Sequence, residues 1–185
     1  MSSTPFVLRA FGSLIALVGF LISPSGVATA TRPPEQEFRL RLYDTHTNER
    51  IDIVYRKGDT YLPDVINRLE LFLRDHRTGD LHHFDPQVFD ILHDLTFALG
   101  HPNAEIDIVC GYCTPWTNEF LRRTTNGVSP HSLHMEGRAI DIRVPGVSTT
   151  ALRDAALGLH RGGVGYYARS QFVHVDDGRV RQWAD

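Results

Sequence analysis

The apolar stretch at the start of the chain decides how much of the sequence is left to fold. Residues 6–22 are nearly all apolar, and Arg9 is the one charged residue among them. Residues 28–30, Ala-Thr-Ala, then supply the small side chains that a signal peptidase requires. Because the unbroken apolar run over 14–22 is too short to cross a bilayer comfortably, the sequence predicts an export signal over 1–30. An uncleaved N-terminal anchor is the alternative, and either segment places the rest of the chain in the periplasm or cell envelope.

About 155 residues remain, which is enough for one domain with a hydrophobic core. We expect a polar, proline-containing linker over 31–37 and the folded domain over 38–185. A hydrophobic fraction of 42% with 10% aromatic residues argues against a disordered or collagen-like chain. The net charge of −3 gives no support to a nucleic-acid-binding protein, because such proteins usually carry a basic excess. We therefore expect no nucleic-acid partner and no stable membrane insertion of the mature domain.

Two kinds of apolar spacing alternate along the predicted domain. Apolar residues two apart predict strands, and apolar residues three or four apart predict helices. On this basis we expect strands at 38–42, 51–53, 105–109, 139–144, 164–167, 172–175 and 180–183, with hairpins joining the first two and the last two. We expect helices at 62–75, 86–99, 116–124 and 149–160, and a loop over 128–138. These elements predict an α+β fold with a small antiparallel sheet and flanking helices.

Two polar residues on predicted strands carry the strongest chemical signal. Asp141 lies between two isoleucines and His174 between two valines, so each faces away from an apolar side of its strand. A buried carboxylate without a partner costs several kcal/mol, and a metal ion would supply that partner. With His134 from the preceding loop, the three form a ligand set suited to Zn²⁺, with a fourth position left for water. From spacing alone, a strand histidine between valines is more often a hydrogen-bonded structural residue.

Two motifs of this chain closely resemble those of the M15 zinc peptidases: Ser132-x-His134-x-x-Gly137-x-Ala139-x-Asp141 and the later Phe172-Val173-His174-Val175-Asp176. A third segment, 109–122, resembles the family's Ser-Gly-Tyr-Arg-Ser-Pro-x-Thr-Asn sequence. The nearest branch is that of the MepK-like murein endopeptidases, a group once described only as a domain of unknown function. The resemblance covers about residues 38–183 and makes Tyr112 a candidate substrate-binding residue.

The resemblance implies a zinc hydrolase that cuts peptide crosslinks of peptidoglycan, of the L,D or the D,D type. It implies Zn²⁺ as cofactor, peptidoglycan peptide stems as partner, and His134, Asp141 and His174 as metal ligands. It also implies the zinc fold that D-Ala-D-Ala carboxypeptidases share with Hedgehog-like domains. Between the two crosslinks, the resemblance favours the bond between two diaminopimelate residues.

Two departures from the family pattern leave parts of the mechanism open. Many relatives have a His-x-His pair at the distal motif, but Phe172 stands in the first position here, so the general base is not identified by that pattern. Asp176, on the same strand face as His174, is one candidate base, and His131 in the loop is another catalytic candidate. The alternative for Asp176 is that it only begins the following turn.

The second departure is Cys113, which stands where the family has an arginine expected to hold substrate or polarise the carbonyl. A cysteine cannot replace the charged fork of an arginine, so Arg138, Arg143 or Arg122 would have to take over. A non-catalytic wall-binding module on the same fold is therefore an alternative function. Cys110 and Cys113 form a Cys-x-x-Cys motif, which allows thiol–disulfide exchange as a third function, or a local structural disulfide, or two independent thiols.

Overall fold

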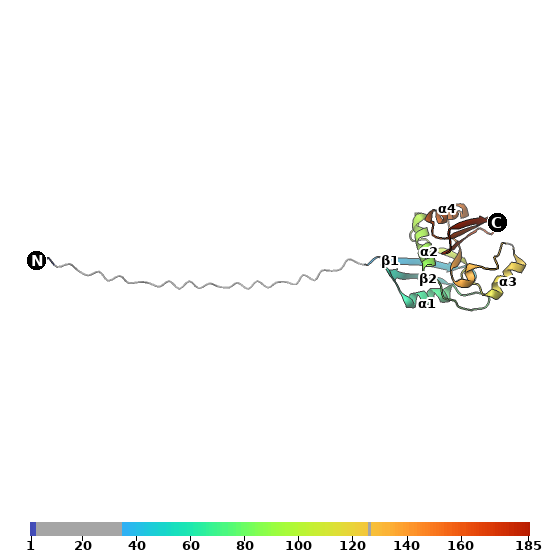
Figure 1. Ribbon diagram of the computed structural model, residues 1–185, viewed down its shortest axis with the longest axis horizontal. Coiled ribbons are helices and arrows are strands. Elements are labelled where there is room, and N and C mark those ends of the chain that lie inside the picture. The colour runs from blue at the N-terminus through green and yellow to red at the C-terminus, as the bar shows by residue number, and fades with distance from the viewer. Residues whose placement is uncertain (3–34, 126) are drawn as a thin grey trace. The chain divides into compact units, whose positions relative to one another are not determined.

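A mixed sheet of eight strands organises the domain, in the order β3-β2-β1-β4-β5-β7-β6-β8 (Figure 1). This computed structural model describes residues 1–2, 35–125 and 127–185, so the predicted export signal lies, apart from its first two residues, outside the described part of the chain. The strands are β1 Glu37–Asp44, β2 Arg50–Lys57, β3 Thr60–Tyr61, β4 Ile106–Cys110, β5 Ala139–Arg143, β6 Gly163–Tyr167, β7 Phe172–Asp176 and β8 Arg181–Ala184.

The α+β class is confirmed, but the sheet is neither small nor purely antiparallel. Strand β1 runs parallel to β4, and β6 runs parallel to β8, whereas the other neighbours are antiparallel. In the parallel pair β1–β4, the N-terminal hairpin lies beside a strand that begins about sixty residues after β1 ends. Alternation within one strand carries no information about such a distant neighbour.

Helices of the described chain lie at α1 Pro63–Phe72, α2 Gln87–Ala98, α3 Pro115–Thr124 and α4 Thr149–Leu159. Helices α2 and α4 contact each other and pack on β1, β6 and β7, whereas α1 packs on β2 (Figure 1). The predicted loop over 128–138 contains a short 3₁₀ helix, Leu133–Glu136, which is too short to give the sequence a period. Within the described ranges, no helix combines the length and the apolar character needed to cross a membrane.

The two faces of strands β5 and β7 differ, as their alternating sequences predict. Ile140, Ile142, Val173 and Val175 are at most 1% exposed and belong to the hydrophobic core. Burying each such side chain contributes roughly 1.5–3 kcal/mol to folding. The intervening residues must point to the opposite face, and these include Asp141 and His174. The core therefore fixes which side of the sheet carries the polar residues.

The predicted hairpin between the last two strands is wrong. Strand β8 does not pair with β7 but lies parallel to β6, on its outer side. The Asp176 carboxylate accepts hydrogen bonds from the backbone N–H groups of Gly163 and Gly178 and pairs with Arg181. These contacts hold the segment between β7 and β8 against the start of β6, the strand beside which β8 lies.

Asp75 ties the loop after α1 to the start of α3. Its side chain is 1% exposed and accepts hydrogen bonds from the backbone N–H and hydroxyl of Thr114, at 2.8 and 2.9 Å, and from the N–H of Arg77. Burial alone raises the pKa of Asp75, but the hydrogen bonds outweigh it and hold the pKa below its usual value. The charged form is therefore favoured by folding.

We expect Asp75→Asn to lower the free energy of unfolding at neutral pH by about 1–3 kcal/mol, because the amide accepts fewer and weaker hydrogen bonds. Since the folded pKa is depressed, this stabilisation is present above the unfolded pKa of about 3.9 and is lost as the pH falls through the folded value. Urea unfolding at several pH values tests both points. The exposed Asp80→Asn is the matched control, and an equal effect of both variants would contradict the assignment.

Gly137 closes the 3₁₀ helix in the left-handed region, at φ +64°. A Cβ atom at this position would collide with the backbone carbonyl of His83. We expect Gly137→Ala to destabilise the fold by at least about 2 kcal/mol, from backbone strain and collision together. Gly79, at φ +79° with nothing within 4 Å, is the control for strain alone. An equal decrease in the melting temperature of Gly137→Ala and Gly79→Ala would show that the collision adds nothing to the backbone strain.

Candidate metal centre

Three neighbouring strands bring chemically active side chains into one row. Asp141 on β5 lies opposite His174 on β7 and opposite Cys110 on β4. The Asp141 side chain is 15% exposed and that of His174 is 9% exposed. The row therefore lies at a nearly buried position on the polar face of the sheet, where a charge needs a partner.

The 3₁₀ helix delivers His134 to this row. The Ser132 hydroxyl caps the helix by accepting the N–H of His134 at 3.4 Å. The His134 ring is held from the other side, since its Nδ1 lies 2.8 Å from the carbonyl oxygen of Gly111. Gly111 must be glycine here, because a Cβ atom would lie 2.6 Å from the carbonyl oxygen of Leu73. His134 is 7% exposed, so its ring orientation is fixed by packing as well.

Three potential ligand atoms converge at one point. The Nε2 atom of His134 lies 3.1 Å from Oδ1 of Asp141 and 3.0 Å from Nδ1 of His174. Asp141 Oδ1 and His174 Nδ1 are 2.9 Å apart. Ligands at the usual zinc bond lengths of about 2.0–2.1 Å stand roughly 3.3 Å apart in a tetrahedron. The spacing of these three atoms therefore fits a shared zinc ion.

The outer ring nitrogens of both histidines have partners of their own. His174 Nε2 lies 3.0 Å from Asp176 Oδ2, and His134 Nδ1 faces the Gly111 carbonyl. Both partners are acceptors, so in each neutral ring the outer nitrogen carries the proton and the inner nitrogen presents a lone pair. Two lone pairs and a carboxylate oxygen thus face one another, an arrangement that calls for a cation between them.

Asp176 is itself firmly held. Its side chain has no exposed surface, and Arg181 contacts it at 2.6 Å and 2.9 Å. The N–H groups of Gly163 and Gly178 donate to the same carboxylate, at 2.9 and 2.8 Å. Both oxygens are thus engaged, one chiefly by these donors and the other by His174 and Arg181. This environment favours a role in orienting His174 over the predicted role of general base.

In the absence of a metal ion, the electrostatics of the cluster favour a proton on His134, which metal binding would displace. Burial lowers the pKa of His134, but the Asp141 carboxylate raises it to about 9. For Asp141, burial raises the pKa, yet both histidines bring it well below the usual value. Burial likewise raises the pKa of Asp176, and His174 and Arg181 lower it strongly. Both carboxylates therefore stay ionised in spite of burial.

The other predicted site residues lie outside this cluster of three atoms. Tyr112 is 8% exposed, belongs to the core, and packs its ring against His82 at 4.9 Å. Arg138 pairs with Asp177 at 2.8 Å. His131 is exposed on the loop that precedes the 3₁₀ helix. Their predicted roles in catalysis and substrate binding remain predictions.

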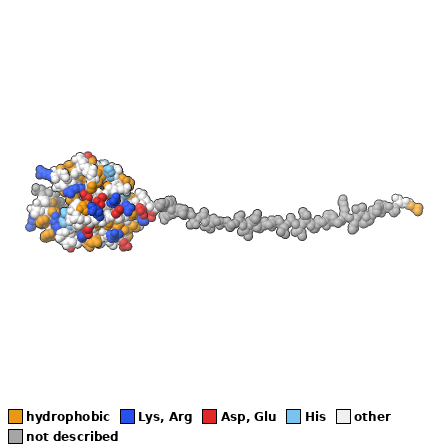
Figure 2. Space-filling model, turned by 180° about the vertical axis from the view of Figure 1, so that it is seen from behind, with side chains coloured by type: hydrophobic (Ala, Val, Ile, Leu, Met, Phe, Trp, Pro, Cys, Tyr) orange, Lys and Arg blue, Asp and Glu red, His pale blue; other side chains and the backbone are white. Residues whose placement is uncertain are grey.

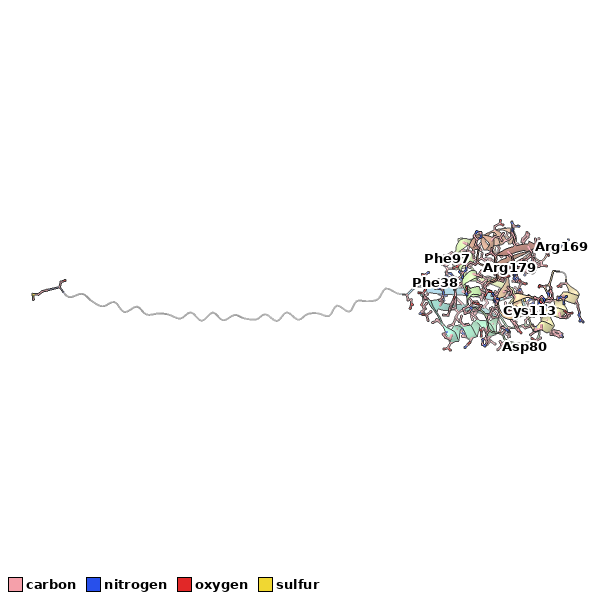
Figure 3. All side chains as sticks on the ribbon, viewed as in Figure 1. Phe38, Asp80, Phe97, Cys113, Arg169 and Arg179 are labelled. Atoms are coloured by element: carbon pink, nitrogen blue, oxygen red, sulfur yellow. The ribbon has the colours of Figure 1, made fainter. Side chains whose placement is uncertain are left out.

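Cys113 is 3% exposed and lies on the segment that leads into α3 (Figure 3). The three arginines considered as substitutes for the family's arginine are bound elsewhere. Arg122 contacts Glu119 at 2.7 Å, Arg143 donates to the carbonyls of residues 170 and 171, and Arg138 is held by the acid at 177. None of these contacts brings a guanidinium to the cluster.

Sequence reasoning missed three parts of the site: the Asp176–Arg181 pair, the Gly111 carbonyl, and the approach of Cys110. The five-residue spacing of Asp176 and Arg181 is no recognised signal, because it depends on the path of the chain into β8. The Gly111 contact is made by backbone and leaves no trace in side-chain pattern. The approach of Cys110 to Asp141 follows from the register of β4 against β5, which the sequence alone did not reveal.

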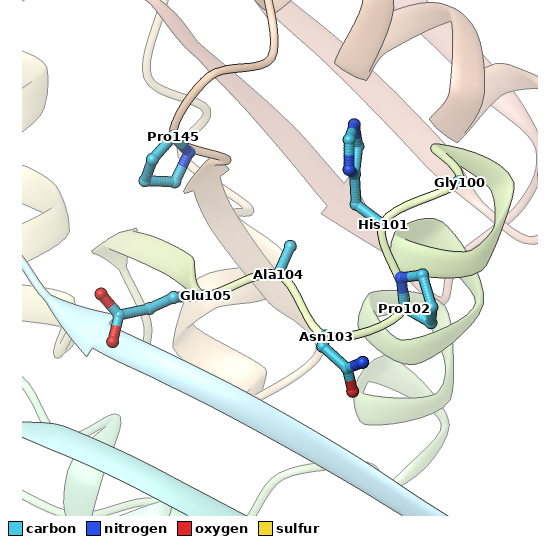
Figure 4. Close-up of a pocket in the computed structure, with 7 residues that line it drawn as sticks. All are labelled: Gly100, His101, Pro102, Asn103, Ala104, Glu105 and Pro145. Atoms are coloured by element: carbon cyan, nitrogen blue, oxygen red, sulfur yellow. The ribbon is translucent and has the colours of Figure 1, made fainter.

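Two other surface features do not compete with this cluster as the functional site. A shallow hollow of about 500 Å³ lies between the end of α2 and the start of β4, lined by residues 100–105 and Pro145 (Figure 4). None of the predicted site residues lines it. On the face shown in Figure 2, acidic and basic side chains are interspersed rather than gathered into one basic area. Ion pairs such as Arg39–Asp52, at 2.6 Å, are typical of the domain.

Comparison with known proteins identifies relatives that cover most of the chain. Residues 32–183 match the family model described as peptidoglycan L,D-endopeptidase MepK. The chain is 36% identical over 166 residues to a probable peptidoglycan L,D-endopeptidase MepK of Haemophilus influenzae, which covers 90% of this chain and 89% of that protein. It is 35% identical over 176 residues to peptidoglycan L,D-endopeptidase MepK of Escherichia coli K12, with 95% and 94% covered. The chain therefore belongs to the M15 peptidase family, in its MepK branch.

Proposed function

We propose that this protein is a zinc-dependent endopeptidase that hydrolyses peptide crosslinks of peptidoglycan. One observation carries the proposal: the proposed ligand atoms of His134, Asp141 and His174 lie within 3.1 Å of one another. The outer ring nitrogen of each histidine faces an acceptor that fixes the orientation of the ring. The names of the relatives support the substrate class, since one is named a peptidoglycan L,D-endopeptidase and the other a probable one. We accordingly expect cleavage of the bond between two diaminopimelate residues.

Bound zinc would supply a water molecule with a pKa of about 7 and would polarise the scissile carbonyl. Two neutral histidines and one carboxylate are the ligands in our proposal, and a fourth position is left for that water. The Gly111 carbonyl and the Asp176 carboxylate hold the two rings so that their inner nitrogens face the centre. The chain thus prepares the ligand geometry before substrate arrives.

Two groups are candidate acceptors for the proton of the attacking water in our proposal. Asp176 is fully buried and bound by Arg181, so we assign it to positioning His174. His131 keeps its predicted catalytic role, because it is exposed and only three residues from a proposed ligand. A substrate carboxylate is a further acceptor that peptidoglycan stems themselves bring.

A non-catalytic wall-binding module on the same fold is the second candidate function. It is favoured by the buried Cys113 at the position of the family's arginine and by the engagement of Arg122, Arg138 and Arg143 in other contacts. Since Arg181, the guanidinium beside the cluster, is itself engaged by Asp176, the scissile carbonyl would have only the metal to polarise it. This candidate predicts binding of peptidoglycan stems without cleavage.

We also propose that the protein acts in the periplasm or cell envelope, with 1–30 as export signal, 31–37 as linker and 38–185 as the catalytic domain. The apolar stretch within the first thirty residues supports export, and the peptidoglycan substrate in the names of the relatives supports the compartment. We further propose that the domain is the zinc form of the fold shared with D-Ala-D-Ala carboxypeptidases and Hedgehog-like domains.

Digestion of two purified muropeptide dimers tests this function. One dimer carries the diaminopimelate–diaminopimelate crosslink and the other the D-Ala–diaminopimelate crosslink, and products are separated by mass. We expect the zinc-loaded protein to convert the first dimer to monomers faster than the second. Binding of either dimer with no monomer formed would support the wall-binding module instead.

A further inference from the structure

Two thiols lie against each other on the wall of the proposed metal centre. Cys110 Sγ and Cys113 Sγ are 2.7 Å apart, and both cysteines are free. Cys110 ends β4 and Cys113 precedes α3, so the two flank the Gly111 carbonyl that orients His134. The N–H of Cys113 also donates to the carbonyl of His134, at 3.3 Å. The pair is therefore part of the framework that holds one ligand.

Cys110 also lies close to two of the proposed ligands themselves. Its sulfur, a nitrogen of His134 and a carboxylate oxygen of Asp141 all lie within 4.8 Å of one another. Thiolate, imidazole and carboxylate are the three ligand types that zinc accepts in proteins. Cys110 is half-buried on the strand beside Asp141, and rotation about its χ1 is the movement that would change the distance from its sulfur to the centre.

The Cys110 sulfur cannot bond to Cys113 and bind the metal at the same time. If Cys110 is bonded to Cys113, its sulfur is not a thiolate and cannot bind the metal in that form. If it binds the metal, it occupies the position that the hydrolytic water needs, and three protein ligands with water become four protein ligands. The disulfide state leaves three protein ligands and a water, as in catalytic zinc sites, whereas the metal-bound thiolate state has four protein ligands, as in structural zinc sites.

We propose that the Cys110–Cys113 pair is a redox switch on the metal centre. In the dithiol form Cys110 supplies a fourth ligand and closes the site, and in the disulfide form the sulfur is withdrawn and the site is open to water. This inference rests on the proposed function, because it takes His134, Asp141 and His174 as the other ligands.

The switch operates by thiol–disulfide exchange with a disulfide reagent or a disulfide-carrying partner. A protein thiolate attacks one sulfur of that disulfide, so that the partner's S–S bond breaks and a mixed disulfide forms. The second protein thiolate then attacks the mixed disulfide and releases the partner's other thiol. In sum, two protein thiols lose two electrons and two protons, and one external disulfide becomes two thiols.

Cobalt spectroscopy of the full protein tests the ligand directly. The metal-stripped protein is loaded with Co²⁺ in its dithiol form and in its disulfide form. We expect a sulfur-to-cobalt charge-transfer band in the near ultraviolet for the dithiol form only. Cys113→Ser should show this band under all redox conditions, because it retains the ligand but cannot form the disulfide. Cys110→Ser should lack it throughout.

A redox titration in glutathione buffers gives a second readout that does not depend on activity. Because linkage is reciprocal, metal that binds the dithiol more tightly must also protect it from oxidation by the same factor. We expect zinc to raise the dithiol-to-disulfide ratio at a fixed buffer by at least about tenfold. Metal-stripped protein without added zinc is the reference for this ratio.

Hydrolysis of muropeptide dimers should be at least about tenfold slower in the dithiol form than in the disulfide form of the wild type. In each serine variant the same ratio of rates should be close to one, because neither variant can switch. Cobalt binding without a sulfur band in the dithiol form would overturn the switch while leaving the proposed function intact. Absence of cobalt binding in both forms would overturn both.

Discussion

His134→Ala removes the metal and lowers hydrolysis of muropeptide dimers by at least about 10³-fold, because activation of water and polarisation of the carbonyl together contribute several kcal/mol. His134 supplies one of the three proposed ligand atoms, which lie within 3.1 Å of one another. With one ligand gone, a nitrogen and a carboxylate remain, which hold zinc far more weakly. Metal content by mass spectrometry and initial rates of cleavage measure the two effects.

The matched control for this variant is His101→Ala. His101 is exposed and lines the hollow at the end of α2 (Figure 4), and none of the three proposed ligands lines that hollow. We expect it to keep both metal content and rate. Thermal unfolding of both variants separates loss of the site from loss of the fold. A His134→Ala protein that retains stoichiometric zinc and full activity would refute the ligand assignment.

Asp176→Asn lowers zinc affinity by about 10- to 100-fold, the range for residues that orient a metal-bound histidine. The asparagine keeps the shape of Asp176 but loses the charge that pairs with Arg181 and that fixes the proton on His174 Nε2. The affinity is measured by competition with a chelator of known strength. Because a positioning residue acts through metal binding, saturating zinc should restore most of the turnover rate.

This rescue separates positioning from general-base catalysis. A general base lost by substitution cannot be replaced by more zinc, so a turnover rate that stays low at saturating zinc would return Asp176 to the catalytic role. Asp177→Asn is the neighbouring control, because Asp177 pairs with Arg138 and not with a ligand. We expect it to change stability rather than zinc affinity.

The parts of the site that could be predicted from the sequence are those set by alternation within one strand. Isoleucines on both sides of Asp141, and valines on both sides of His174, place the two polar residues on the face away from the core. The same alternation gave the N-terminal hairpin, and the hydroxyl of Ser148, which accepts the N–H of Ala151, marks the start of α4 as expected. Local chemistry was sufficient for these features.

The parts that could not be predicted depend on which strands become neighbours. Nothing within 172–183 shows that β8 pairs with β6 rather than with β7. The role of Asp176 changes with that pairing, because Arg181 reaches it only along this path. Similarly, Cys110 and Asp141 are thirty-one positions apart, and only the register of β4 against β5 makes them neighbours. Such contacts are set by tertiary packing rather than by period or propensity.

A zinc titration of crosslink cleavage tests the central claim most directly. Metal-stripped protein, prepared without added reductant, is given increasing zinc, and monomers released from the diaminopimelate–diaminopimelate dimer are counted by mass. A single three-residue centre predicts no cleavage without metal and a rate that rises to a plateau at one zinc per chain. Cleavage that persists in the presence of excess chelator, or a zinc-loaded protein that binds the dimer and leaves it intact, would contradict the account.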